Sequence, residues 1–231
     1  MDMDELSEPL PTAAIADAAV RLGIRVSAAP AALIPLLPGT AFAGPAAPVT
    51  HLGSVDVLLE AIDDAPPGAV LVVDNGGRHD EACVGDLMLL EAREAGMRGA
   101  VIWGRHRDTA QLREIGLPVF SLGAYPFGPR RVPPAGRAMR SAYLDGVLVG
   151  AGDWIVADDD GVLVVGQDRR AELVATAVRI QSVEGEQSQR MRAGASLRDQ
   201  LDFDEYRRRQ AADPELTLRR YLQETGGAIE T

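Results

Sequence analysis

Apolar residues in the first half of the chain alternate between segments with helical spacing and short continuous runs typical of buried strands. Apolar residues at helical spacing predict an amphipathic helix over Thr12–Leu22, and shorter helical patterns follow at 54–62, 83–95 and 109–115. Continuous apolar runs predict buried strands at 69–73, 99–103 and 118–121. Strands that alternate with helices indicate a parallel α/β core, because parallel neighbours need crossover connections.

The rest of the chain divides into irregular and helical stretches. Residues 30–48 are rich in Ala, Pro and Gly, which favours extended or irregular backbone, and 125–137 has the composition of a surface loop. Apolar runs at 147–149 and 162–165 flank an acidic turn at 158–161 and predict a hairpin. A long helix is expected over 168–192. We therefore expect one α/β domain over 1–192 and a charged C-terminal extension over 193–231, either a partner-binding arm or a loosely held tail.

Composition narrows the class of protein. The chain has 231 residues, of which 46% are hydrophobic and 25% charged, as in ordinary soluble domains. A net charge of -11 argues against nucleic-acid binding, since phosphate backbones would be repelled. The acidic start lacks the pattern of a secretory signal, and no apolar stretch reaches the length of a membrane span. We expect a soluble, cytoplasmic protein without membrane contact.

The single cysteine, Cys83, excludes an intramolecular disulfide and offers no zinc-like cluster with the three histidines. A thiol nucleophile is one interpretation of Cys83. A half-buried small hydrophobe is favoured, because no histidine has a spacing that demands pairing with it.

Polar residues follow two of the predicted strands and suggest a site. The strand that ends at Val73 leads to Asp86, near the start of a helix whose free N–H groups can receive a carboxylate. The strand that ends at Trp103 leads to Arg107 and Asp108, and ligands of open α/β sheets bind at this carboxyl edge. An Arg fork and an Asp that holds a hard divalent cation suit enolate chemistry. The competing interpretation is a solvated Arg-Asp pair and an Asp that only caps its helix.

The spacing of these three residues resembles a family signature. Asp86, twenty residues and then Arg107-Asp108 match the pattern of the RraA-like family, which includes divalent-metal-dependent 4-hydroxy-4-methyl-2-oxoglutarate/4-carboxy-4-hydroxy-2-oxoadipate aldolases. The resemblance covers roughly residues 11–201. Its further landmarks are Ala65–Gly68, Gly85–Met88, Glu94–Gly96 and Val156–Val162.

The resemblance implies a swivelling β/β/α-type fold, assembled as a homotrimer or homohexamer, and a role for each site residue. Arg107 would bind the pyruvoyl group, Asp108 would anchor Mg²⁺ or Mn²⁺ largely through waters, and Asp86 would position a metal-linked water. The substrate carboxylate would be held by backbone N–H groups of the segment that contains Gly85, Leu87 and Met88.

The aldolases also take an acidic residue from the C-terminal region of a neighbouring subunit. The nearest candidates here are Glu184 and Glu186, although a solvated carboxylate on a helix face is the simpler interpretation of either residue alone.

The implied activity is a metal-dependent lyase, a class II aldolase or decarboxylase. It would cleave a 4-hydroxy-2-oxo acid by retro-aldol reaction, or decarboxylate oxaloacetate, and release pyruvate through a metal- and Arg-stabilised enolate. The alternative is a non-catalytic regulator that binds a ribonuclease or another protein. Regulators of RNase E with this fold typically lack the Asp after the Arg, so Asp108 favours catalysis.

Departures from the aldolase pattern leave the substrate open. Trp103–His106 replaces an acidic residue, Gly and small apolar residues before Arg107-Asp108. His106 is either an acid or base, a contact for a second substrate carboxylate, or a loop histidine without a catalytic role. Arg78 and His79 would supplement anion binding or are simply solvated. The acidic cluster 158–160 has the composition of a metal site, but a hairpin turn is favoured.

Overall fold

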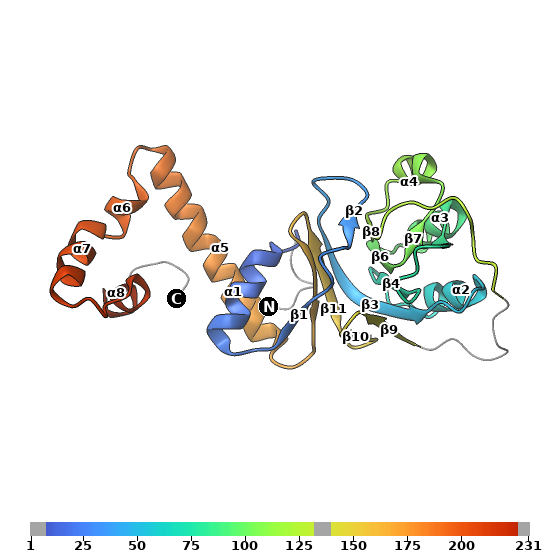
Figure 1. Cartoon of the computed structure of the whole chain (residues 1–231), viewed down its shortest axis with the longest axis horizontal. Helices are drawn as coiled ribbons and strands as arrows, with labels where there is room; N and C mark the ends of the chain where they lie inside the picture. The colour runs from blue at the N-terminus through green and yellow to red at the C-terminus, as the bar shows by residue number, and fades with distance from the viewer. Residues whose placement is uncertain (1–7, 132–139, 226–231) are drawn as a thin grey trace. The chain divides into compact units, whose positions relative to one another are not determined.

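The computed structural model describes residues 8–131 and 140–225, which form two compact units (Figure 1). Among the described residues, unit 1 holds 8–13, 25–131 and 140–171. Unit 2 holds Ala14–Ile24 and 172–225. The expected boundary after residue 192 coincides with the end of helix α5 (Arg170–Arg192), and as a domain boundary it stays a prediction.

Unit 1 is built on an eight-stranded sheet with the order β1-β12-β11-β3-β4-β6-β8-β2. Strands β3, β4, β6 and β8 run parallel, whereas β11 and β12 on one side and β1 and β2 at the edges pair antiparallel. The parallel core predicted from the alternation of strands and helices is therefore confirmed. The strands are β1 (Val26–Ala28), β2 (Ile34–Pro35), β3 (Phe42–Thr50), β4 (Val70–Asp74), β6 (Gly99–Trp103), β8 (Val119–Ser121), β11 (Trp154–Asp158) and β12 (Gly161–Val165).

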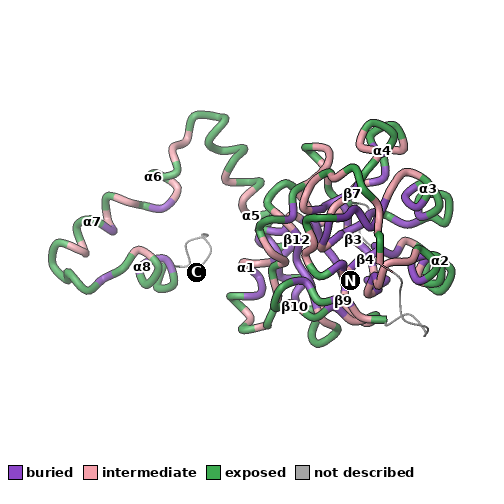
Figure 2. The backbone as a smooth tube through the Cα atoms, turned by 45° about the vertical axis from the view of Figure 1, so that its right-hand side comes forward, coloured by how far each residue is buried: buried purple, intermediate pink, exposed green. Residues whose placement is uncertain are grey.

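The central strands β4, β6, β8 and β11 are buried on both faces of the sheet, which explains why they are almost wholly apolar (Figure 2). Helices α2 (Asp56–Asp63), α3 (Asp86–Glu94) and α4 (Thr109–Ile115) pack on one face around Leu71 and Ile102. The hairpin β9 (Ser141–Leu144) and β10 (Val147–Gly150) packs on the other face. Each large apolar side chain that is fully buried here contributes about 1.5–3 kcal/mol to folding. The layers give the α/β fold with the β/β/α arrangement that the family resemblance implies.

A second, very short parallel pair carries the candidate site. Strand β5 (Ala82–Val84) pairs with β7 (Arg105–His106), and the N–H of Arg107 donates to the Val84 carbonyl at 3.0 Å. The helix predicted over 83–95 therefore begins only at Asp86, because its first two residues belong to β5.

One other expectation from the sequence needs correction. The strand at 147–150 pairs with β9, and the true partner of β12 across the acidic turn is β11. Residues 154–158 form an almost continuous apolar run beside the turn, so they outcompete the more distant strand. The expectation of extended or irregular backbone over 30–48 is confirmed, because the segment contains β2 and most of the nine-residue strand β3, which is stabilised by pairing with β11 and β4.

The acidic turn between β11 and β12 accepts hydrogen bonds from neighbouring segments of unit 1. Both the N–H and the hydroxyl of Thr12 donate to the Asp158 carboxylate at 2.7 Å, and the Gly39 N–H donates to Asp159 at 2.9 Å. These bonds support the interpretation of this cluster as a structural turn.

Unit 2 consists of most of α1 (Thr12–Leu22), α5, α6 (Leu197–Gln200), α7 (Phe203–Ala212) and α8 (Leu218–Thr225). Its distal helices have their own small core, and a capping box between Ser196 and Asp199 starts α6. The helical extension is confirmed, and residues 197–225 are not a loose tail. Within the described residues, none of the helices is both long and apolar enough to cross a bilayer.

Candidate active site

The three residues predicted to be catalytic meet beside the start of α3. The Arg107 Nε lies 3.3 Å from the Asp108 Oδ2, and the same carboxylate oxygen accepts a weak bond from the Asp86 N–H at 3.5 Å. The Asp86 carboxylate accepts the N–H of Leu87 at 2.8 Å. The structure thus brings a guanidinium, the Asp108 carboxylate and the first turn of a helix to one place at the carboxyl edge of the sheet, whereas the Asp86 side chain lines a neighbouring hollow.

This close approach depends on glycines. A Cβ added at Gly85 would lie 2.6 Å from the Asp108 Oδ2 and 3.2 Å from the Arg107 Nε, and one at Gly128 would lie 3.0 Å from the Arg107 Nη1. Gly85 is the N-cap of α3 in extended backbone and offers no capping side chain. Since Asp86 is the first helical residue, it acts as an acidic partner of the helix dipole and not as the N-cap.

Asp108 has an unusual backbone conformation. It lies in the left-handed region, with φ 61° and ψ 40°, and is the N-cap of α4 without a side-chain capping bond. Non-glycine residues in this region are uncommon, although Asp tolerates it better than most, and such residues cluster at functional sites. The carboxylate of Asp108 is therefore turned toward Arg107 and α3 instead of satisfying its own helix.

An open pocket of about 340 Å³ lies against this group and is lined by Arg107, Asp108, Thr109, Ala124, Tyr125 and Pro126. The side chains of Arg107 and Asp108 are 48% and 35% exposed, so both are accessible to a small ligand. A second hollow, of about 260 Å³, lies between α3 and α4 next to Asp86. Sequence reasoning missed Thr109 and Tyr125, although the position of Thr109 directly after Arg107-Asp108 is a usable signal.

Other residues of the predicted substrate site differ in accessibility. The side chain of Leu87 is 78% exposed, whereas Met88 is 9% exposed and packs in the core below α3. Their role as carboxylate-binding residues would rest on backbone N–H groups, and the Leu87 N–H already bonds to Asp86.

His106 is buried, with 3% exposure. Its Nδ1 lies 2.8 Å from the Ser121 Oγ, and its Nε2 lies 3.1 Å from the Thr109 Oγ1. Burial, helped by the charges of Arg113 and Arg105, lowers the pKa of His106, which favours the neutral imidazole. Because both ring nitrogens bond to protein side chains, this placement argues against the predicted substrate contact.

Cys83 is 3% exposed and belongs to the core, more deeply buried than expected. Burial raises the pKa of its thiol to about 12, so the thiolate form is negligible at neutral pH. The interpretation as a small hydrophobe is supported, and a nucleophilic role is not.

The basic residues Arg78 and His79 are engaged by neighbouring side chains. Arg78 pairs with Asp80 at 2.8 Å and with Glu81 at 3.4 Å. The His79 Nδ1 lies 3.0 Å from the Arg105 Nη2. These contacts give both residues a local structural role in addition to any effect on anions.

A buried polar network, which sequence reasoning missed, follows the ends of β3 and β4. Asn75 accepts a bond from Arg131 at 3.0 Å and lies 2.9 Å from the His51 Nδ1, and Arg131 also forms an ion pair with Glu81 at 2.5 Å. Burial alone would raise the pKa of Glu81, but Arg131 and Arg78 outweigh it and lower this pKa. Burial lowers the pKa of His51.

The donor groups restrict what metal the site can hold. Within residues 8–131 and 140–225, no three His, Cys, Asp or Glu side chains cluster closely enough to form a protein cage for an ion. Mg²⁺ keeps several waters and needs one or two carboxylates. The Asp108 carboxylate therefore fits a largely hydrated hard cation, and not a zinc-type centre.

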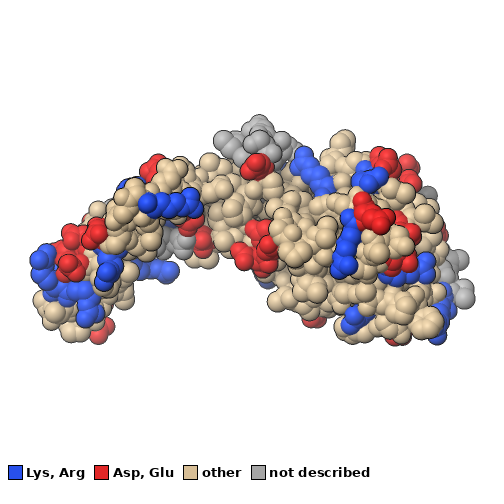
Figure 3. Space-filling view, turned by 90° about the horizontal axis from the view of Figure 1, so that it is seen from above, with Lys and Arg blue, Asp and Glu red and all other residues tan. Residues whose placement is uncertain are grey.

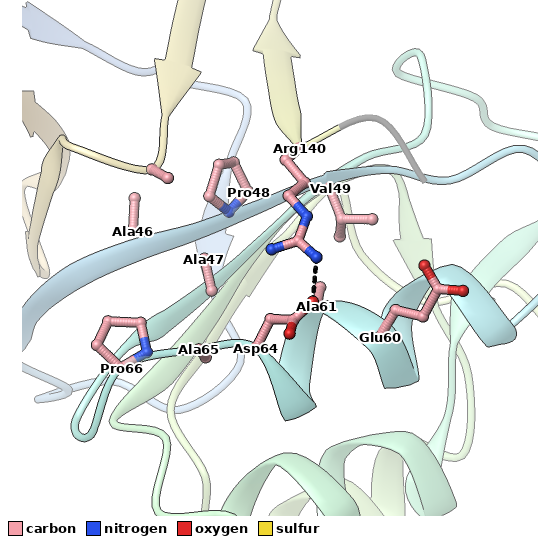
Figure 4. A pocket seen from close by; sticks show the side chains of 11 residues that line it. Ala46, Ala47, Pro48, Val49, Glu60, Ala61, Asp64, Ala65, Pro66 and Arg140 are labelled. Carbon is pink, nitrogen blue, oxygen red and sulfur yellow. Dashed lines mark hydrogen bonds and ion pairs between the residues drawn. The ribbon is translucent and has the colours of Figure 1, made fainter. Parts of the chain in front are cut away.

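Other surface features of unit 1 suit a small polar ligand less well. Figure 4 shows a hollow of about 70 Å³ between β3 and the end of α2, where Arg140 points at Asp64 and pairs with it. Most of its lining is Ala, Pro and Val, and its opposite charges neutralise each other. On the face shown in Figure 3, acidic and basic side chains are interspersed, without one continuous basic stripe.

The fold and this site define a mixed α/β protein with an Arg-Asp pair at the carboxyl edge of a parallel sheet. Residues 12–164 match the RraA-like family, which is described as Aldolase/RraA. The chain therefore belongs to this family.

Its similarity to individual proteins is partial. It is 39% identical over 101 residues to the "Putative 4-hydroxy-4-methyl-2-oxoglutarate aldolase" of Halorhodospira halophila, covering 44% of this chain and 61% of that one. It is 35% identical over 137 residues to Protein DlpA of Legionella pneumophila, covering 59% of this chain but 22% of that protein. The crystal structure of Streptomyces coelicolor RraAS2, described as an unusual member of the RNase ES inhibitor RraA family, superposes with a TM-score of 0.67 at 30% identity, covering 79% of this chain and 92% of that one.

Proposed function

We propose that this protein is a divalent-metal-dependent lyase that breaks a C–C bond in a small 2-oxo acid and releases pyruvate. The observation that supports this most is the contact of Arg107 with Asp108 beside the first turn of α3, on an open pocket. The names of similar proteins, putative 4-hydroxy-4-methyl-2-oxoglutarate aldolases, agree with it.

In the proposed reaction the bond between C3 and C4 of the substrate breaks, and its electron pair moves to the oxygen of the 2-oxo group. The Arg107 guanidinium donates hydrogen bonds to this developing enolate, a stabilisation that exists mainly in the transition state. The backbone N–H of Met88 would orient the substrate carboxylate, helped by the positive end of α3, and the Leu87 N–H would join it only after leaving the Asp86 carboxylate.

For a 4-hydroxy-2-oxo acid, a water held by Asp86 would take the proton of the C4 hydroxyl as C4 becomes the carbonyl of the second product, and the same water would return a proton to C3 to complete pyruvate. For oxaloacetate, CO₂ leaves instead and no hydroxyl proton has to move. Asp108, assisted by Asp86, would hold Mg²⁺ or Mn²⁺ largely through waters. The bound ion supplies positive charge that stabilises the enolate.

Pyruvate release can be followed with a coupled dehydrogenase, using oxaloacetate or 4-hydroxy-4-methyl-2-oxoglutarate with Mg²⁺. We expect turnover that EDTA abolishes, and a loss of about 100-fold or more in kcat/KM for Arg107→Ala and Asp108→Ala. The exposed residues Arg198 and Asp63 provide matched controls, Arg198→Ala and Asp63→Ala, that should stay at the wild-type rate. Absence of metal-dependent turnover on every 2-oxo acid tested would refute the proposal.

Assembly is part of the same proposal. We expect a homotrimer or homohexamer, in which Glu184 or Glu186 on α5 reaches the site of a neighbouring subunit. In the single chain, Glu186 pairs with Arg190 at 3.4 Å on an exposed helix face. Light scattering should give three or six times the chain mass of 24.5 kDa. Glu184→Gln and Glu186→Gln would separate the two candidates, because only one should lower kcat.

The second candidate is a non-catalytic regulator that binds a ribonuclease. It is favoured by the structural similarity to Streptomyces coelicolor RraAS2, whose family is described as inhibiting RNase ES. Inhibition of purified RNase E-type enzyme at micromolar concentration, by a protein without lyase activity, would support it over the first.

A further inference from the structure

A chain of buried hydrogen bonds runs from the end of β8 to the wall of the pocket. The Gly123 N–H donates to the Ser121 Oγ at 3.1 Å, the Ser121 Oγ lies 2.8 Å from the His106 Nδ1, and the His106 Nε2 lies 3.1 Å from the Thr109 Oγ1. Ser121 and His106 are 2% and 3% exposed, so solvent does not compete for these bonds. Thr109 is half-buried and lines the pocket next to Arg107 and Asp108.

The partners of Ser121 favour one direction of this chain. The Ser121 Oγ accepts the Gly123 N–H, and within residues 8–131 and 140–225 its other partner is the His106 Nδ1, which is therefore the acceptor at hand for the buried Ser121 proton. A neutral imidazole that accepts at Nδ1 carries its proton at Nε2. The His106 Nε2–H then donates to the Thr109 Oγ1, which leaves the Thr109 hydroxyl proton free to point into the pocket.

We infer that Thr109 is a substrate-contacting residue, and that Ser121 and His106 are positioning residues that turn its hydroxyl proton toward an oxygen of the bound 2-oxo acid. The inference rests on the proposed function for its ligand. It explains why His106 is buried beside the Arg107-Asp108 pair although its ring cannot reach a ligand. The opposite tautomer would reverse the chain, and Thr109 would then present lone pairs to an anionic ligand.

The tautomer can be measured without ligand or metal. The chain has three histidines, His51, His79 and His106, so imidazole ¹⁵N spectra are simple, and the signals of His106 are those lost in His106→Asn. We expect His106 to be neutral at pH 7 with a protonated Nε2 and an unprotonated Nδ1. A protonated Nδ1 overturns the inference.

The hydroxyl can be tested with oxalate, a stable analogue of the pyruvate enolate, titrated calorimetrically in the presence of Mg²⁺. Thr109→Val keeps the shape but removes the donor, and we expect its Kd to rise by about 10-fold or more, as for a lost bond to a charged group. Thr109→Ser should recover most of this affinity. Thr225→Val, on α8 of unit 2, removes a hydroxyl that bonds to its own helix and should bind as the wild type does.

The outcomes distinguish a failure of the inference about Thr109 from a failure of the proposed function. If Arg107→Ala abolishes oxalate binding and Thr109→Val binds like the wild type, the inference about Thr109 is wrong and the proposed function stands. If the wild-type protein does not bind oxalate with Mg²⁺, both are wrong. Loss of affinity in Thr109→Val and its recovery in Thr109→Ser support the inference.

Discussion

Gly85→Ala is the sharpest test of the candidate site, because it adds one methyl group beside the two key side chains. The added Cβ would lie 2.6 Å from the Asp108 Oδ2, so the carboxylate must retreat by about 0.8 Å to reach an ordinary contact of 3.4 Å. A displacement of about 1 Å in a catalytic group costs roughly 100-fold in rate. We therefore expect kcat/KM for pyruvate release to fall by about 100-fold.

The same substitution should hardly affect folding. Gly85 has φ -133° and ψ -169°, extended backbone that alanine adopts without strain. The group that must move is the end of a side chain that is 35% exposed. Urea unfolding should therefore show a change in unfolding free energy within about 1 kcal/mol.

Gly150→Ala is the matched control, since a Cβ there would meet only the Asp153 Oδ2, at 3.8 Å. Its activity and stability should match the wild type. A Gly85→Ala protein with wild-type kcat/KM would refute the argument that the close contact of Gly85 with Asp108 belongs to the site. A decrease of several kcal/mol in the free energy of unfolding would show instead that Gly85 is needed for folding.

Three further predictions concern the structure around the site. Glu81 has a folded pKa below its ordinary 4.5, so its stabilising ion pair with Arg131 is present above pH 4.5 and is lost as the pH falls through the folded pKa. The free energy of unfolding, measured in urea, should therefore fall less steeply between pH 6 and 3 in Glu81→Gln than in the wild type. Equal pH dependence of the two proteins would contradict this. Cys83 should resist thiol reagents at pH 8 in the native protein and react in urea, and fast native labelling would show that its burial is wrong. Leu112→Ala should lower the unfolding free energy by about 2–5 kcal/mol, as for other fully buried leucines, and a loss below 1 kcal/mol would contradict the packing of α4.

The alternating strands and helices of the core could be predicted from the sequence, because the apolar patterns that define them are local. Runs such as 69–73 and 99–103 are apolar without interruption, which is what a strand buried on both faces requires. The hairpin partner of β12 was mispredicted because two apolar runs competed for it, and proximity to the turn decided the pairing.

The site was predictable in part for the same reason. Arg107 and Asp108 follow a strand directly, so their place at the carboxyl edge needs only the topology. Their contact with Asp86 depends on the pairing of β5 with β7, two strands of three and two residues that have no periodicity of their own. Asp108 in left-handed backbone and His106 buried between hydroxyl groups are consequences of tertiary packing, and local sequence patterns do not contain them.

The segment Trp103–His106, where this chain departs from the aldolase pattern, lies mainly beneath the site. Trp103 packs within about 3.0 Å of a Cβ position on Gly77, the backbone of Gly104 leaves room for Asn75, and His106 is buried. The departure therefore changes the support of the Arg107-Asp108 turn more than the groups that face a ligand. We therefore expect the reaction type to follow the chemistry of Arg107 and Asp108, and the preferred substrate to follow how the altered segment positions their turn beside the pocket.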